Sequence, residues 1–262
     1  MAQLNPPIRD WTNQVVWVVG ASSGIGEALS ALLVQKGARV VASARRQQVL
    51  DQLSPAPART LPCDVSDPAS IDHAVSVMRD EGLVPDVVFW VAGVYHPMTS
   101  DALDLAGVRE TFEINLIAAY KGLAAVLALW KEFPAKPRHW SWVSSVAGYR
   151  GLPQAAAYGA SKAALTYLAE TNYLELKAQG IAVSVVCPGF VQTRLTDIND
   201  FKMPAIIHPD EAARLTLDGI ARGAFEIHYP KRFTRWLKLL RLLPYRLYFS
   251  LIGKTVKSPH GH

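Results

Sequence analysis

The chain has 262 residues, of which half are hydrophobic and 19% are charged, and its formal net charge is +5 at pH 7. This composition excludes a disordered or collagen-like chain, and the length fits one α/β domain with a large core. Cys63 and Cys187 are too few for a disulfide framework or a zinc cluster, so a reducing compartment is expected. The first residues lack the apolar stretch of a secretory signal, which predicts a cytoplasmic protein.

Short β-rich runs alternate with longer helical patterns along most of the chain. The first strand is expected at Val15–Val19, an apolar run typical of a strand that is buried on both faces. Further strands are expected at 39–44, 59–63, 86–92, 140–144 and 181–187. Helical patterns occupy 25–34, 68–81, 107–131, 154–179 and 209–222. Strands separated by helices of this length form right-handed crossovers, which predicts an α/β fold with a doubly wound parallel sheet and helices on both faces.

A glycine-rich turn follows the first expected strand, and its residues are Gly20, Ser22, Ser23, Gly24, Ile25 and Gly26. Glycines in such a turn let the backbone approach a pyrophosphate, and the free N–H groups of the following helix attract phosphate. An ordinary tight turn is the alternative, because a glycine-rich turn alone is weak evidence.

The second expected strand ends at Ala44 and is followed by Arg45 and Arg46, with no acid. An acid at this position accepts hydrogen bonds from the ribose 2′-OH of NAD, whereas a cation binds the 2′-phosphate of NADP. The alternative is a pair of solvated arginines that open a helix. Because the arginines follow a strand that comes after the glycine turn, the pattern favours NADP(H) over NAD(H).

Four polar residues form a candidate catalytic set. Tyr158 and Lys162 are four residues apart, which places them on one face of a helix, and a nearby cation stabilises a phenolate. Ser145 comes at the end of an expected strand, where it can donate to a substrate carbonyl. Asn115 lies between Ile114 and Leu116 and needs hydrogen-bond partners if buried; bending or capping the helix is its ordinary alternative.

The set Asn115, Ser145, Tyr158 and Lys162, combined with the G-x-x-x-G-x-G turn, resembles the short-chain dehydrogenase/reductase family over residues 12–229. The resemblance implies a Rossmann-like, NADP-binding catalytic domain over 1–229. It also implies an oxidoreductase that transfers a hydride between NADP(H) and a carbonyl or alcohol.

The resemblance implies a role for each member of the set. Tyr158 would exchange a proton with the substrate oxygen, and Ser145 would hold that oxygen. Lys162 would bind the nicotinamide ribose and lower the pKa of the phenol, and Asn115 would anchor a water in the proton relay.

Further cofactor contacts are implied at Asp64, Val65, Ala92, Gly93, Pro188, Gly189, Val191 and Thr193. An ordinary strand exit is the alternative for the Pro188-Gly189 pair. The chain also departs from the family pattern: Val19 stands where a threonine is usual, and Trp90 and Val91 stand where asparagines are frequent. The missing amides put the local rigidity of the fourth strand in doubt.

Apolar residues near the expected site predict an apolar ketone, aldehyde or matching alcohol as the small-molecule substrate. A loop that could close over the substrate, or pack on the body instead, carries Phe190, Leu195, Ile198, Phe201, Met203, Ile206 and Ile207. The same mouth is expected to include Tyr95, His96, Met98, Tyr149 and Leu152. The rival interpretation is a dinucleotide-sensing binding protein without turnover, against which the complete catalytic set argues.

Residues 230–262 form a basic amphipathic extension with eight lysines and arginines and no acid, leaving 19 basic and 22 acidic residues in 1–229. A largely helical segment is expected over 230–252, interrupted at Pro244. An apolar stripe is expected at Trp236, Leu240, Leu243 and Leu247, with Arg235, Lys238 and Arg241 away from it.

Mixing of cations with leucines and tryptophan in this extension argues against nucleic-acid binding. Such a segment suits an anionic membrane surface, which would make the protein peripheral, or a contact with the body or within a homo-oligomer such as a dimer or tetramer.

Overall fold

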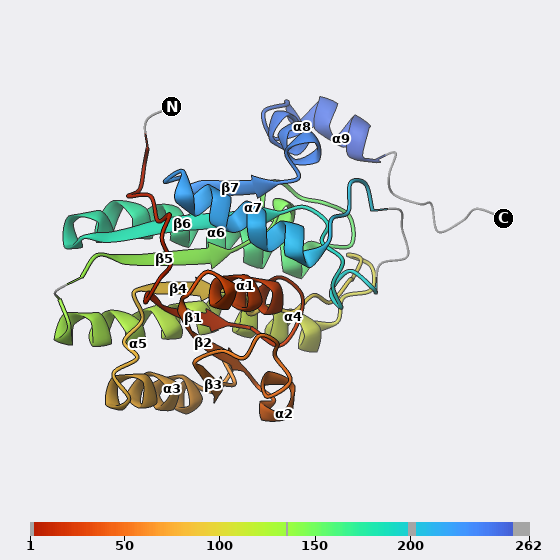
Figure 1. The fold of residues 1–262 in the computed structure, drawn as a ribbon. Helices are drawn as coiled ribbons and strands as arrows, with labels where there is room; N and C mark the ends of the chain where they lie inside the picture. Colours follow the sequence, from red (N-terminus) through yellow and green to blue (C-terminus); the bar gives the residue numbers. More distant parts are fainter. Residues whose placement is uncertain (1–2, 135, 199–202, 254–262) are drawn as a thin grey trace.

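The protein is described by a computed structural model that covers residues 3–134, 136–198 and 203–253. Within these residues, seven parallel strands form one sheet in the order β3-β2-β1-β4-β5-β6-β7 (Figure 1). The strands are β1 (Val15–Val19), β2 (Arg39–Ala44), β3 (Arg59–Pro62), β4 (Val87–Trp90), β5 (Arg138–Val143), β6 (Ile181–Pro188) and β7 (Glu226–Tyr229). The strand order reverses between β1 and β4, which opens a crevice at the carboxyl ends of these strands.

Helices cover both faces of the sheet, so the predicted doubly wound α/β fold is confirmed (Figure 1). The longer helices are α1 (Gly24–Gln35), α3 (Pro68–Asp80), α4 (Leu105–Phe112), α5 (Ala118–Glu132), α6 (Ala156–Leu176) and α7 (Pro209–Ala221). Helices α1 and α7 pack on one face, whereas α3, α5 and α6 pack on the other. Short turns of helix are α2 (Gln47–Leu50), the 3-10 turns η2 (Val146–Gly148) and η3 (Lys177–Gln179), and the π-helical turn η1 (Glu113–Ile117).

Two features differ from the expected elements. Strand β7 was not expected, and it adds a parallel edge beside β6. The single helix expected over 107–131 is divided by η1 into α4 and α5.

Tryptophan packing compensates for the missing amides of β4. The Trp90 side chain is fully buried and meets Trp17 edge-on at a centroid distance of 6.1 Å. It also stacks on Trp140 at 6.0 Å. Gly122 on α5 makes room for this ring, because a Cβ atom there would lie 2.1 Å from it. Aromatic packing therefore holds β4 against β1, β5 and α5.

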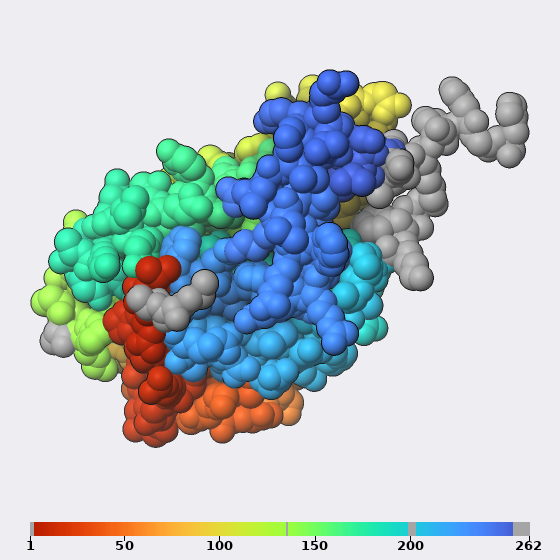
Figure 2. Space-filling model, turned by 90° about the horizontal axis from the view of Figure 1, so that it is seen from above, coloured from red at the N-terminus to blue at the C-terminus, as the bar shows by residue number. Residues whose placement is uncertain are grey.

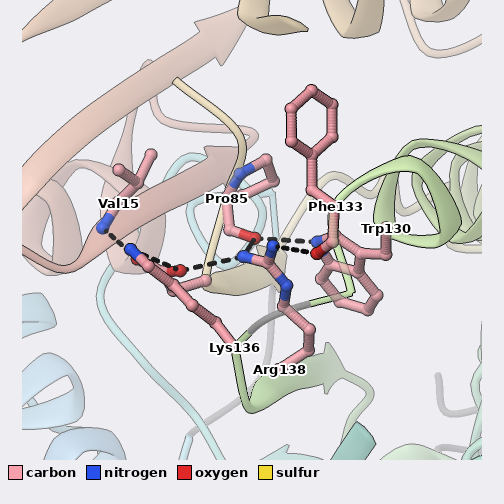
Figure 3. Close-up of polar contacts among 7 residues, drawn as sticks. Val15, Pro85, Trp130, Phe133, Lys136 and Arg138 are labelled. Carbon is pink, nitrogen blue, oxygen red and sulfur yellow. Dashed lines mark hydrogen bonds and ion pairs between the residues drawn. The ribbon is translucent and has the colours of Figure 1, made fainter. Parts of the chain in front are cut away.

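A buried ion pair joins the amino-terminal ends of the central strands, at the sheet edge opposite the crevice (Figure 3). Arg138 Nη1 donates to Asp86 Oδ1 at 2.8 Å and to the carbonyl oxygen of Pro85 at 2.9 Å. Asp86 Oδ2 accepts from the backbone N–H of Val15 at 2.9 Å, and the Trp130 indole donates to Pro85 O at 2.7 Å. Burial lowers the pKa of Arg138, and the charge of Asp86 opposes that shift.

The continuous helical stretch Leu105–Glu132 is long and apolar enough to cross a membrane, with a mean hydropathy of 1.5 over its most apolar 18 residues. Its Ala118, Leu123 and Val126 side chains belong to the core cluster that contains Trp90. The stretch therefore serves as a core helix of this fold.

The extension after β7 forms helices α8 (Lys231–Arg241) and α9 (Tyr245–Ile252), in agreement with the helical segment interrupted at Pro244. These helices form a continuous band over one face of the molecule (Figure 2). Lys238 was expected to lie with the outward cations, but its ammonium pairs with Glu226 of β7.

Candidate active site

A cleft of about 340 Å³ lies where β1, β2, β4, β5 and β6 end. Because parallel strands bring their carboxyl ends to one edge, residues distant in the sequence meet there. The expected site residues that line the cleft are Gly20, Ser22, Ser23, Gly24, Ile25, Arg45, Arg46, Asp64, Val65, Ala92, Gly93, Ser145, Tyr158, Lys162, Pro188, Gly189, Val191 and Thr193. Gly26 and Asn115 support the cleft from behind without lining it.

Lys162 projects from α6 and is almost fully buried. Its Nζ donates to the carbonyl oxygen of Val143 at 3.0 Å, at the end of β5. It also lies 5.7 Å from the centroid of the Tyr158 ring. Burial lowers the pKa of Lys162 to about 8, because a charged ammonium loses hydration there.

Tyr158 lies one turn earlier on α6 and is half-buried. Burial raises the pKa of its phenol to about 12, and the hydrogen bond from Ser145 offsets only part of that rise. The family resemblance implied a pKa lowered by Lys162. In this structure burial raises that pKa instead, so the phenol is protonated at neutral pH.

Ser145 follows β5 directly and begins the turn η2. Its backbone is extended, with a φ of −165°, and its Oγ accepts from the N–H of Ala147 at 3.1 Å. The Ser145 hydroxyl thus lies within hydrogen-bonding reach of the Tyr158 phenol.

Asn115 is fully buried in the π-helical turn η1. Its Oδ1 accepts from Val94 N at 2.8 Å, and its Nδ2 donates to Val94 O and Ser161 Oγ, both at 3.0 Å. These bonds join the exit of β4 to α6. A Cβ atom on Gly93 would lie 3.2 Å from both Asn115 Oδ1 and Lys162 Nζ, so the glycine keeps this junction open.

The start of α1 fits an anionic group. Ser23 precedes the helix, and its side chain does not cap the first turn, so the N–H groups there remain available. Gly24 has a φ of +57°, and a Cβ atom on it would lie 2.6 Å from Thr193 Cγ2. A Cβ atom on Gly26 would lie 2.1 Å from Gly20 O, so a larger residue does not fit at this position of the turn.

Arg45 and Arg46 are exposed at the end of β2. Within the described part of the chain, no carboxylate lies within ion-pair distance of either guanidinium. Asp64 faces the same cleft, and its Oδ1 accepts from Ser66 N at 3.0 Å and Ser66 Oγ at 2.7 Å. Two unpaired cations beside a helix N-terminus fit a dinucleotide with an additional phosphate.

The expected apolar loop is only partly within the described residues. Val191 and Ile207 form a parallel bridge at its base, and Phe190 contacts Phe233 at a centroid distance of 5.6 Å. Ile198 and Ile206 are exposed, whereas the expected Phe201 lies outside the described residues.

Tyr149 does not line the mouth as expected. It is buried, and its hydroxyl donates to Glu226 Oε1 at 2.5 Å. The expected His96 is partly exposed and pairs with Glu110 at 3.0 Å.

Some contributors to the site were not predicted. Tyr95 was expected only to line the mouth, but its ring lies 5.0 Å from that of Tyr158. Thr196 Oγ1 accepts from Thr193 N and donates to Val191 O, which shapes the loop after β6. The spacing of two threonines three residues apart is the only sequence signal for that turn.

The sequence matches the short chain dehydrogenase family over residues 14–202. It is 34% identical over 237 residues to an uncharacterized oxidoreductase of Myxococcus xanthus, covering 88% of this chain and 93% of that protein. It is 29% identical over 212 residues to the 3-oxoacyl-(acyl-carrier-protein) reductase FabG of Escherichia coli, covering 79% and 85%.

The fold is similar to that of solved structures. A short chain dehydrogenase of Burkholderia cenocepacia in complex with NADP superimposes with a TM-score of 0.81 at 22% identity, covering 95% of this chain and all of that one. Actinorhodin polyketide ketoreductase with NADPH superimposes with a TM-score of 0.74 at 25% identity, covering 83% and 95%.

Proposed function

The chain belongs to the short-chain dehydrogenase/reductase family, and we propose that it transfers a hydride between NADP(H) and an apolar carbonyl or its matching alcohol. Its membership makes it an oxidoreductase of that family. The observation that carries the proposal is the convergence of Ser145, Tyr158 and Lys162 on the same cleft as Arg45. The chemistry and the cofactor contacts would thus share one crevice.

In this reaction Tyr158 is the acid for reduction and the base for oxidation. Burial keeps its phenol protonated at neutral pH, with a pKa of about 12, which is the form that donates to a substrate oxygen. Ser145 donates a second hydrogen bond to that oxygen. Bound NADPH supplies the hydride that reduces the carbonyl carbon.

Lys162 and Asn115 maintain the arrangement. The Lys162 ammonium is held by Val143 O, and its remaining protons face the cleft, where they would bind ribose hydroxyls. Asn115 fixes the exit of β4 against α6, which keeps Gly93 close to Lys162.

NADP(H) preference is supported by Arg45 and Arg46. Each guanidinium can donate two parallel hydrogen bonds to a 2′-phosphate, whereas no acid replaces them for a 2′-hydroxyl. The similar ketoreductase was solved with NADPH, which agrees with this choice.

An apolar substrate is supported by the side chains around the cleft. Val94, Leu195 and Val191 line it, and the Tyr95 ring packs beside Tyr158. An extended apolar surface of this kind would bind a hydrophobic ketone or aldehyde better than a sugar.

We also propose a cytoplasmic homo-oligomer. Four large apolar side chains outside the cleft are exposed: Ile117 at the end of η1, Tyr120 on α5, and Tyr167 and Leu174 on α6. Leu174 is 75% exposed. Large apolar side chains outside the substrate cleft suit a subunit contact.

The proposal is tested by following NADPH absorbance with a panel of ketones and aldehydes of increasing apolar surface, with a sugar as the polar control. The expected result is turnover that rises with apolar surface and disappears in Tyr158→Phe. If NADPH binds but no carbonyl is reduced, the dinucleotide-sensing alternative is supported and the enzyme proposal fails.

A further inference from the structure

The C-terminal helices present an apolar face that the body does not cover. On α8 the exposed large apolar side chains are Trp236, Leu239 and Leu242, of which Trp236 is 68% and Leu242 is 80% exposed. On α9 they are Tyr245, Leu247, Phe249 and Leu251. Scattered single apolar residues are normal on a surface, but a group on two adjoining helices indicates an interaction site.

The opposite side of these helices is already anchored. Thr234 and Tyr248 are buried, and Leu237 packs against the main core cluster. Tyr248 Oη donates to Gly151 O at 2.6 Å, and Lys238 pairs with Glu226. The exposed face is therefore the outward side of a docked structure, and docking on the body does not account for it.

The charges on this surface are all of one sign. Residues 230–253 include six lysines and arginines and no acid, and Arg232, Arg235 and Arg246 are exposed among the apolar side chains. A twofold contact between two copies would place this surface against itself, which brings arginines together without counter-charges. An anionic lipid surface instead offers negative headgroups to the arginines and an apolar layer to the leucines.

We propose that α8 and α9 form an interfacial docking surface for an anionic bilayer. Trp236 and Tyr245 lie at the headgroup boundary, Leu239, Leu242 and Leu247 enter the apolar layer, and the arginines contact the headgroups. Figure 2 shows the two helices as a band on one face, which a flat partner can reach.

Docking on this surface places the substrate side of the protein near the bilayer. Arg150, in the segment between Ser145 and Tyr158, donates from Nη1 to Leu240 O at 2.9 Å and to Leu243 O at 2.7 Å. The helices that would contact lipid are therefore bonded directly to a loop that adjoins the catalytic residues. Binding itself does not require the proposed reaction.

Vesicle co-sedimentation of the full chain tests the proposal. We expect binding to vesicles of phosphatidylcholine mixed with phosphatidylglycerol, weaker binding to pure phosphatidylcholine, and release by high salt. The variant Trp236→Ser/Leu239→Ser/Leu242→Ser should reduce partitioning at least ~10-fold, because three exposed side chains lose their apolar contact with lipid. Arg232→Glu/Arg235→Glu should cause a similar loss on the anionic vesicles only.

Matched controls separate this surface from general effects. Leu105→Ser removes a leucine that is 64% exposed at the start of α4, and Arg39→Glu reverses an exposed charge at the start of β2. Both should bind vesicles like the unmodified chain. Thermal unfolding should be unchanged in all variants, because the substituted side chains are exposed.

Two outcomes would overturn the proposal. One is an unmodified protein that stays in the supernatant with anionic vesicles. If, in addition, the triple serine variant has a lower native mass by light scattering, the surface is a contact between copies. The other is a triple serine variant that binds as well as the unmodified chain.

Discussion

The Nζ of Lys162 lies 5.7 Å from the ring centroid of Tyr158, and burial favours the neutral form of both side chains. The pKa of Tyr158 rises to about 12, and that of Lys162 falls to about 8. At neutral pH Tyr158 is therefore protonated and Lys162 is still mostly charged, so the phenol holds the proton that reduction of a carbonyl consumes. Binding and proton transfer can therefore be separated experimentally by substitution at these two positions.

Replacement of Tyr158 by Phe should reduce the rate at least ~100-fold, because it removes the transferable proton and keeps the ring. NADPH affinity, measured by calorimetry, should change little, since the ring contact with Tyr95 is retained. Near-normal turnover in Tyr158→Phe would remove Tyr158 from the mechanism.

Replacement of Lys162 by Met should stabilise the fold at pH 7 while weakening NADPH binding. Burial lowers the pKa of Lys162 from 10.5 to about 8, so the folded state carries a desolvation penalty that is full below pH 8. As pH rises from about 8 toward 10.5 that penalty disappears, and the stability of the unmodified protein approaches that of the variant.

At pH 7 we expect a gain of about 1–3 kcal/mol in the free energy of unfolding, since the lost bond to Val143 O offsets part of the relieved penalty. Urea unfolding at pH 7 and at higher pH measures it. If the stability difference between Lys162→Met and the unmodified protein does not shrink as pH rises, burial of the Lys162 charge does not destabilise the fold.

Cofactor selectivity should depend on Arg45. The unmodified protein should use NADP(H) at least ~10-fold better than NAD(H) by kcat/KM, because a single charge-assisted hydrogen bond contributes about 1.5–3 kcal/mol. Ala44 also lines the cleft, so Ala44→Asp with Arg45→Ser should invert the preference. Arg39→Ser, which removes an exposed arginine from the start of β2, should leave it unchanged. Equal efficiency with both cofactors in the unmodified chain would contradict the assignment.

The central strands and the gathering of the site could be predicted because their causes are local. The apolar run Val15–Val19 and the glycines after it specify a buried strand and a tight turn, and parallel topology then brings the strand ends together. Strand β7 has only four residues, and Ile227 and Tyr229 are its two apolar positions, which is too short for a reliable period. The burial of Tyr149 depends on Glu226 of that strand, so it could not be anticipated either.

The π-helical turn at Asn115, like the burial of Tyr149, depends on contacts with residues distant in the sequence. Its amide bonds to Val94 and Ser161, which are 21 and 46 residues away along the chain. Neighbouring residues do not encode these contacts, and the uninterrupted apolar pattern of 107–131 predicts an ordinary helix. The π-helical turn is therefore associated with long-range hydrogen bonds, which the periodicity of the sequence does not reveal.

The ion pair of Asp86 and Arg138 should be the more important of two contrasting pairs for stability. Arg138→Met leaves the buried Asp86 carboxylate without its guanidinium and should cost about 3–5 kcal/mol in the free energy of unfolding. Arg59→Met breaks the exposed pair with Glu81 and should cost less than about 1 kcal/mol. Because Arg138 begins β5 and the cleft lies where the strands end, KM should not change in Arg138→Met. Equal losses in urea unfolding would contradict the contrast.

Arg150 should control how firmly the C-terminal helices are held. Its guanidinium lies 4.0 Å from the Tyr248 ring centroid and donates to Leu240 O on α8 and to Leu243 O just after that helix. Hydrogen bonds from a charged group and a cation–π contact are together worth about 2 kcal/mol or more, so Arg150→Ala should raise amide hydrogen exchange in 240–252 at least ~10-fold.

Tyr248→Phe removes only the bond to Gly151 O, so it should raise exchange in the same segment less than Arg150→Ala does. Exchange in the β1 amides should be unchanged in both variants, since local opening of the extension leaves the central sheet intact. Unchanged exchange in 240–252 for Arg150→Ala would mean that the packing of Thr234, Leu237 and Tyr248 alone holds the helices. Faster exchange confined to that segment would identify Arg150 as the link between the extension and the loop beside Ser145.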